Sequence, residues 1–320
     1  MLRIVRNRVL TIVPVLFIVS IGTFFMVSLV PGDPATAVLG ENATPAQYAQ
    51  VRDAMGLDKP IGERYGTWLA NALHGDLGVN LVPPVGRVTE RLTQALPVNL
   101  ELMVLAIAMA LLIAIPLGTW SAYRPGSHFD RVASFGTLSI ISLPSFLAAI
   151  VLLLMFTVQW HVFPLGLWAR PSEVGWWENF RHAFLPALTL ALPEAAVYAR
   201  LLRSDMISTL HEEFILAARA KGMPTGHILF REALRPSSFS LITLTGLSIG
   251  RLIAGSIIVE QVFSLPGLGS VMVNAARRND FPLVQGGVLI IAVIYLTSNL
   301  LVDVGYALID PRIRRGYTNT

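Results

Sequence analysis

The chain has 320 residues, of which 54% are hydrophobic and only 14% are charged, and its formal net charge is +4. A soluble domain carries about 25% charged residues, so this composition indicates a membrane protein rather than a soluble domain with a large core. Cysteine is absent, which excludes disulfides and thiolate metal sites. The modest positive charge fits membrane orientation better than nucleic-acid binding, because the basic residues are concentrated in particular loops.

Six apolar stretches are expected to cross a bilayer as helices. The first follows three arginines and runs without a charge from residue 9 to residue 30. Ala35-Thr36-Ala37 resembles a signal-peptide cleavage site, but the apolar run exceeds the about 7–15 residues of a signal peptide. The fourth stretch is short and is interrupted by Pro186 and Pro193. The remaining spans are expected at about residues 98–120, 132–158, 184–199, 237–259 and 283–302.

The sequence therefore predicts an all-α polytopic membrane protein, with one transmembrane domain over residues 1–320. Six spans place both termini on one side of the membrane. The loops on that side are shorter in total and richer in Lys and Arg than the opposite loops, of which residues 31–97 are the longest. By the positive-inside rule the termini and residues 208–236 are expected to be cytoplasmic, in a multi-pass protein of the cell membrane.

Residues 208–236 have the pattern of two short helices separated by a turn. Ser208 or Thr209 is expected to cap the first helix, with Glu212 and Glu213 in its first turns, where the helix dipole favours negative charge. Gly222 is expected to end it, because glycine accepts the positive φ of a helix terminus. The second helix is expected to start at Pro224 or Thr225 and to end before Pro236.

This segment is predicted to bind another protein. Ala217 and Ala218 leave a smooth patch that a partner backbone can approach, and the bulky Phe214 and Ile215 beside it are suited to filling a pocket. Internal packing of the alanines and of Gly222 is the alternative.

No catalytic motif is found in the sequence. There is no G-x-x-x-x-G-K-[ST] and no Gly-Lys pair, so the chain carries no P-loop. His211-Glu212 begins like a zinc-protease helix but lacks the second histidine, and G-x-S-x-G does not occur. We expect no metal, no cofactor and no enzymatic activity on this chain. If ATP drives it, hydrolysis takes place on another polypeptide.

Five motifs together resemble the permease subunits of ABC importers, most closely the dipeptide, oligopeptide and nickel branch. The acid that names the EAA loop of this family is replaced here by Leu216, and the outer loop looks shortened after Gly78. In chain order the motifs are Pro31-Gly32-Asp33-Pro34-Ala35, Gly75-Asp76-Leu77-Gly78, Ala217-Ala218-Arg219-Ala220-Lys221-Gly222 with Ala233-Leu234-Arg235-Pro236, Val259-Glu260-Gln261-Val262-Phe263-Ser264-Leu265-Pro266-Gly267-Leu268-Gly269, and Tyr306-Ala307-Leu308-Ile309-Asp310-Pro311-Arg312.

The resemblance implies a type I ABC importer permease fold and a heteromeric importer in the membrane lipid. Its partners would be a second, similar permease, two ATPase subunits that hold ATP and Mg²⁺, and an extracytoplasmic substrate-binding protein, with no nucleic acid. The substrate would be a dipeptide or short oligopeptide, with glutathione or a nickel complex as alternatives. The residues expected to couple the chain to an ATPase are Glu213, Phe214, Ile215, Ala217, Ala218, Arg219, Lys221 and Gly222.

Charged residues within or beside the spans are further candidates. A charge at mid-span costs at least about 2.5–3.5 kcal/mol, so Arg251 is expected to face protein or water. It is a candidate for the translocation pathway, with Glu194 and Gly250, whereas an ion pair with Glu194 is the structural alternative. Glu260 and Asp280 are candidates for contact with the binding protein, with solvated helix caps as the alternative.

Two other classes of function fit the sequence less well. An ion-coupled secondary transporter would need intramembrane acids and an inverted repeat, and Arg251 and Glu194 are the only clear mid-span charges in the sequence. A membrane enzyme would need a nucleophile and a base, and no such constellation is present.

Overall fold

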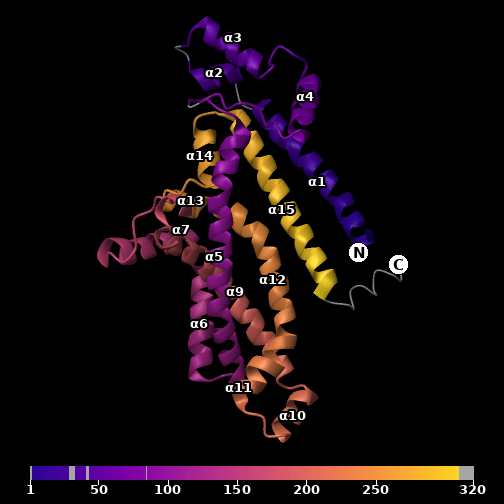
Figure 1. The fold of residues 1–320 in the computed structure, drawn as a ribbon, viewed down its shortest axis with the longest axis vertical. Helices are drawn as coiled ribbons and strands as arrows, with labels where there is room; N and C mark the ends of the chain where they lie inside the picture. The colour runs from indigo at the N-terminus through magenta and orange to yellow at the C-terminus, as the bar shows by residue number, and fades with distance from the viewer. Residues whose placement is uncertain (1, 29–32, 41–42, 84, 310–320) are drawn as a thin grey trace. The chain divides into compact units, whose positions relative to one another are not determined.

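The computed structural model describes residues 2–28, 33–40, 43–83 and 85–309 (Figure 1). In this part the chain is helical apart from its loops and one isolated bridge between Val79 and Arg87. Its contacts divide it into two compact units, residues 1–99 with 266–320 and residues 100–265. Parts of two sequence motifs, Pro31-Gly32 and Asp310-Pro311-Arg312, lie outside the described residues.

The first unit is built on two long helices, α1 (Leu2–Ser28) and α15 (Phe281–Ile309), which pack side by side (Figure 1). A core of small and branched apolar side chains surrounds the first turns of α15. It consists of Leu77, Val88, Leu92, Ala95, Leu268, Ala275, Leu283 and Val284. The other helices of this unit are α2 (Pro34–Leu39), α3 (Pro45–Ala54), α4 (Ile61–Leu73), the start of α5 (Val88–Tyr123) and α14 (Leu268–Arg277).

Local sequence signals set the starts of the short helices. The Asp33 carboxylate accepts a hydrogen bond from the Ala35 N–H at 3.0 Å, and a proline occupies the first position of α2. Thr44 and Gln47 form a reciprocal capping box at the start of α3. Both helices therefore begin where a polar cap precedes a proline, as the missing proline N–H allows.

The second unit is organised around α9 (Trp176–Thr209), which packs against five other helices of the unit. Fifteen of its residues are buried, from Asn179 to Met206. Around it lie the rest of α5, α6 (His128–Ser142), α7 (Ser145–Leu152), the π-helical η1 (Leu153–Gln159), α8 (Pro171–Val174), α10 (Glu213–Ala220), α11 (Thr225–His227), the π-helical η2 (Ile228–Ala233), α12 (Leu234–Gly255) and α13 (Ile257–Val262).

Two predicted spans differ from the structure. The stretch 132–158 was expected to be one helix, but it bends by 105° between α6 and α7. Leu143 is extended and Pro144 follows it, because a residue before proline is disfavoured in the helical region. The stretch 184–199, expected to be short and broken, is part of the continuous α9. Pro186 and Pro193 lie inside this helix, where packing against its neighbours tolerates them.

Three described helices are long and apolar enough to cross a membrane, namely α5, α9 and residues 281–302 of α15. The bent pair of residues 128–142 and 145–159 would make a fourth, and residues 10–26 of α1 form a shorter apolar helix. The count of six spans stays a prediction.

Candidate functional site

The segment 208–236 is a helix, a turn and a second helix, at one end of the second unit (Figure 1). The predicted cap was wrong: α9 continues to Thr209, and α10 starts after Glu212, whose side chain makes no capping hydrogen bond. Glu213 lies in the first turn, where its charge is favourable for the helix dipole. The predicted end of the second helix was also wrong, because α11 and η2 lead directly into α12, which contains Pro236.

The predicted role of Gly222 in ending the first helix is confirmed. Gly222 has a φ of +74°, and its N–H donates to the Arg219 carbonyl at 2.9 Å. The Met223 N–H donates to the Ala218 carbonyl at 3.2 Å. This pair of hydrogen bonds is the Schellman arrangement, in which the residue after the cap takes the left-handed conformation. No atom lies within 4 Å of the position of a Cβ on Gly222, so only the backbone conformation demands glycine.

The apolar residues of α10 divide between two faces. Ile215 is fully buried and Ala218 is nearly so, which one helical turn of separation explains. Phe214 and Leu216 are 46% and 55% exposed, and Ala217 is exposed as well. Ile215 and Ala218 therefore hold α10 on its own unit, contrary to their expected place on a contact surface. The exposed side of α10 is made by Phe214, Leu216 and Ala217, with the charged Glu213, Arg219 and Lys221 also exposed.

Glu194 of α9 and Arg251 of α12 form an ion pair. The Arg251 Nη2 donates to the Glu194 Oε2 at 2.7 Å and to the Ser248 Oγ at 2.9 Å, and the Ser248 hydroxyl donates to the same carboxylate oxygen at 2.8 Å. The Glu194 side chain is 10% exposed, whereas the Arg251 side chain is 57% exposed. Gly250 is buried beside them on α12. The structural alternative for Arg251, an ion pair with Glu194, is thus present, yet more than half of the Arg251 side chain stays accessible.

The two acids expected to meet a binding protein are both buried. Glu260 of α13 is 0% exposed and interacts with the Ser256 hydroxyl at 2.5 Å. Asp280 is 2% exposed, and its carboxylate accepts a hydrogen bond from the Leu81 N–H at 3.2 Å. Neither side chain is exposed to a partner in this structure, and their contact with a binding protein stays a prediction. Each acid satisfies nearby polar groups instead, as burial of a carboxylate requires.

A second ion pair, between Asp130 and Arg203, was not predicted from the sequence. The Asp130 carboxylate of α6 accepts hydrogen bonds from Nε and Nη2 of Arg203 on α9, at 2.5 and 2.7 Å. It also accepts the Gly126 N–H at 2.8 Å. Asp130 is 3% exposed, so this contact ties the turn between α5 and α6 to α9. Sequence reasoning found no sign of it, because the partners are 73 residues apart and neither lies in a motif.

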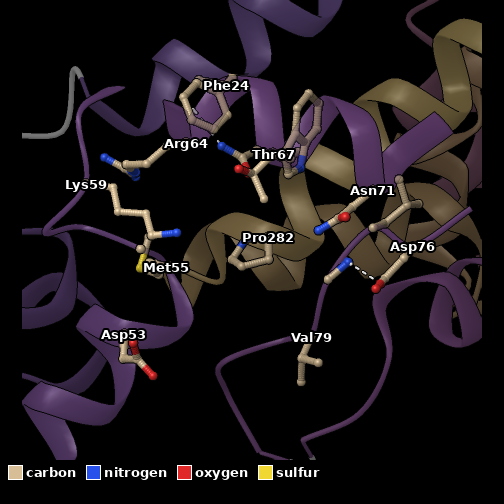
Figure 2. A pocket seen from close by; sticks show the side chains of 15 residues that line it. Phe24, Asp53, Met55, Lys59, Arg64, Thr67, Asn71, Asp76, Val79 and Pro282 are labelled. Atoms are coloured by element: carbon tan, nitrogen blue, oxygen red, sulfur yellow. Dashed lines mark hydrogen bonds between the residues drawn. The ribbon is translucent and has the colours of Figure 1, made fainter. Parts of the chain in front are cut away.

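The motif Gly75-Asp76-Leu77-Gly78 lies at a cavity of about 330 Å³ in the first unit. Leu77 is buried in the core, and the Asp76 carboxylate accepts the Gly78 N–H at 2.9 Å. Figure 2 shows that Asp76 lines the same cavity as Arg64 and Asn71, which come from α4. The Arg64 guanidinium lies 5.6 Å from the centre of the Phe24 ring. The motif thus shapes one wall of a cavity that carries both signs of charge.

The comparisons with known proteins agree with one another. The family model described as "Binding-protein-dependent transport system inner membrane component" matches residues 114–315, and the N-terminal model of the same system matches residues 1–83. A putative peptide transport system permease protein of Brucella abortus (strain 2308) is 36% identical over 318 residues, which cover 98% of this chain and 99% of the relative.

Two further relatives cover almost their whole length. The dipeptide transport system permease protein DppB of Escherichia coli (strain K12) is 34% identical, with 98% of this chain and 99% of the relative covered. The oligopeptide transport system permease protein AppB of Bacillus subtilis (strain 168) is 34% identical, with 96% and 98% covered. The chain is therefore a multi-pass inner-membrane permease that belongs to the family of binding-protein-dependent transport system inner membrane components.

Proposed function

We propose that this chain is one permease subunit of an ATP-driven ABC importer that moves dipeptides or short oligopeptides across the cytoplasmic membrane. The names of the relatives support the peptide substrate, since the Escherichia coli and Bacillus subtilis proteins are dipeptide and oligopeptide permeases. Six spans, with both termini in the cytoplasm, form one transmembrane domain over residues 1–320. A second permease completes the pathway, a binding protein delivers the peptide, and two ATPases hydrolyse ATP with Mg²⁺, while this chain binds no cofactor.

The exposed apolar side of α10 is the observation that carries this proposal. Phe214 and Leu216 are each about half exposed on a helix of eight residues outside the long helices. Ala217 lies between these two side chains around the helix axis, and its small side chain lets a partner approach the backbone closely. Large apolar side chains around a small residue are the features of an interface anchor. We infer that α10 is seated in a groove of an ATPase and that Gly222 sets the angle at which the chain returns to α12.

Arg251 is proposed to line the translocation pathway. In this geometry only Nη2 of its guanidinium makes hydrogen bonds within the described part of the chain, so Nη1 and Nε remain available. An arginine that is half exposed at membrane depth faces water or a partner protein, because lipid contact is unfavourable. A face that pairs with the second permease satisfies this condition, and a peptide carboxylate is a matching ligand. Glu194 and Gly250 then position Arg251 rather than bind the peptide.

The experiment is to purify the chain with its co-expressed partners and to measure peptide uptake and ATP hydrolysis in proteoliposomes. Ala217→Glu places a charge at the centre of the proposed interface, so uptake should fall at least about tenfold while the chain remains inserted. Ala49→Glu makes the same exchange on the exposed side of α3 and should leave uptake unchanged. Failure of any ATPase to purify with the chain, or normal uptake with Ala217→Glu, would refute the proposal.

A further inference from the structure

A second cavity, of about 440 Å³, is lined by residues from the end of α5, the turn after it, α10, α11 and the segments beside them. We call it the two-arginine cavity. Two of its lining residues are Arg124 and Arg219, and no Asp or Glu lines it. The other lining residues are Tyr123, Leu210, Met223, Thr225, Ile228 and Leu229. All of them belong to the second unit.

Both arginines lack a carboxylate partner within the described residues, in contrast to Arg203 and Arg251 of the same unit. The Arg124 guanidinium lies 5.4 Å from the centre of the Tyr123 ring, and both residues line the cavity. The Tyr123 hydroxyl interacts with the side chains of Thr225 and Arg124, and Arg219 is close enough to act on it electrostatically. The cavity thus gathers two guanidinium groups and hydroxyl donors around one space, an arrangement that attracts an anion.

The shape of the donors favours phosphate. A guanidinium presents parallel N–H groups that match two oxygens of a phosphate or carboxylate. Two such groups that line one cavity from different elements suit an anion with oxygens on several sides, which a phosphate has and a carboxylate lacks. The cavity is also wider than a single carboxylate needs.

The position along α5 indicates where the phosphate comes from. α5, one of the candidate membrane spans, ends at Tyr123, so on the proposed topology this residue is expected near the cytoplasmic surface of the membrane. Trp120 is 53% exposed and its ring lies 6.2 Å from that of Tyr123. Exposed tryptophan and tyrosine at the end of a span are typical of the membrane interface, at the level of the lipid headgroups. A cationic cavity at that level meets phospholipid phosphates before any soluble anion.

We propose that the two-arginine cavity binds the phosphate group of an anionic phospholipid and so attaches the 208–236 segment to the membrane surface. The inference rests on the proposed function for the placement of this segment at the cytoplasmic surface. It also changes the predicted role of Arg219, which contacts lipid on this account rather than an ATPase. Lipid binding would hold the base of α10 while its exposed apolar side remains free.

The test is a titration of the full chain, purified in detergent, with phosphatidylglycerol, followed by native mass spectrometry. The double variant Arg124→Gln/Arg219→Gln should weaken binding of phosphatidylglycerol by at least about tenfold, since two charge-assisted contacts are lost. Arg235→Gln removes an exposed arginine of the same unit that does not line the cavity, and binding should be unchanged. Phosphatidylcholine should bind more weakly than phosphatidylglycerol, because its choline is repelled by the guanidinium groups.

Three results would overturn the proposal. The first is unchanged phosphatidylglycerol binding in the double variant, or in Arg219→Gln alone if the double variant does not fold. The second is that inorganic phosphate fills the site and phosphatidylglycerol does not. The third is loss of ATPase association in the double variant with lipid binding intact, which would assign the cavity to an ATPase side chain. Because lipid binding is measured on the permease alone, its failure is separate from a failure of the proposed transport function.

Discussion

The ion pair between Asp130 and Arg203 makes the sharpest prediction for stability. Asp130 is buried and accepts two hydrogen bonds from one guanidinium, whereas the Arg203 side chain is 31% exposed. Asp130→Asn removes the charge and can keep only one of the two contacts, because the amide nitrogen is itself a donor. Breaking a fully buried pair costs about 3–5 kcal/mol, and access of water to Arg203 lowers this to about 2 kcal/mol here.

A double-mutant cycle isolates the interaction from other effects of each substitution. The free energy of unfolding is measured by denaturation with SDS in mixed micelles for Asp130→Asn, Arg203→Gln and the combined variant. A coupling energy of at least about 1 kcal/mol is expected, because either single substitution already removes the ion pair and the second substitution has no pair left to break. Arg131→Gln, an exposed neighbour on α6, should change the stability by less than about 0.5 kcal/mol.

The pair has a definite refuting result. If the two single substitutions add within about 0.5 kcal/mol, the residues do not interact energetically, whatever their separation in the structure. The turn between α5 and α6 would then be held by the Ser127 cap and by the Gly126 N–H contact rather than by α9.

Three further predictions concern single positions. A Cβ on Gly118 would lie 2.8 Å from a backbone carbonyl oxygen of α9, so Gly118→Ala should destabilise the chain by about 1–3 kcal/mol in the same denaturation assay. In the control variant Gly136→Ala, the new Cβ meets no atom within 4 Å, so this substitution should stabilise α6. Burial raises the pKa of the Asp280 carboxyl, so its favourable contribution to stability is present below its unfolded pKa of about 3.9 and is lost as the pH rises through the folded value. Asp280→Asn should remove this pH dependence in denaturation curves. Gly222→Ala should lower the ratio of peptide uptake to ATP hydrolysis, because its φ is positive, while Gly226→Ala, with an ordinary φ and free space, should not.

The sequence was informative where the signal is local. The end of α10 follows from the preference of glycine for positive φ, and the start of α11 from a proline that cannot continue the preceding helix. Local sequence does not determine whether a proline inside a predicted span breaks the helix. Pro144 stands where the chain bends by 105°, whereas Pro186 is buried in a continuous helix. The outcome depends on which helices surround each proline, and that information is not in the neighbouring residues.

The buried face of α10 shows the same limit. Phe214, Ile215 and Leu216 are consecutive apolar residues, so composition gives no reason to choose among them. The structure buries Ile215 and leaves the residues on both sides exposed. A helix of eight residues has little stability of its own, and tertiary contact sets its rotation. Ile215 and Ala218 lie three residues apart and share the buried face. Their helical spacing can be read from the sequence, but the sequence does not tell which face of α10 is buried.

The charged residues Glu194 of α9 and Arg251 of α12 connect the fold to the proposed transport. A carboxylate removed from water must find donors, which is why Glu194 accepts from both Ser248 and Arg251. That pairing neutralises the acid, but it engages only Nη2 of Arg251 and leaves the side chain 57% exposed. An arginine needed only to neutralise Glu194 would be expected to bury its guanidinium against the carboxylate. The exposed remainder is explained when the α12 face that carries Arg251 meets water or a second permease, so the ion pair holds the guanidinium in place and does not compete with a role in the pathway.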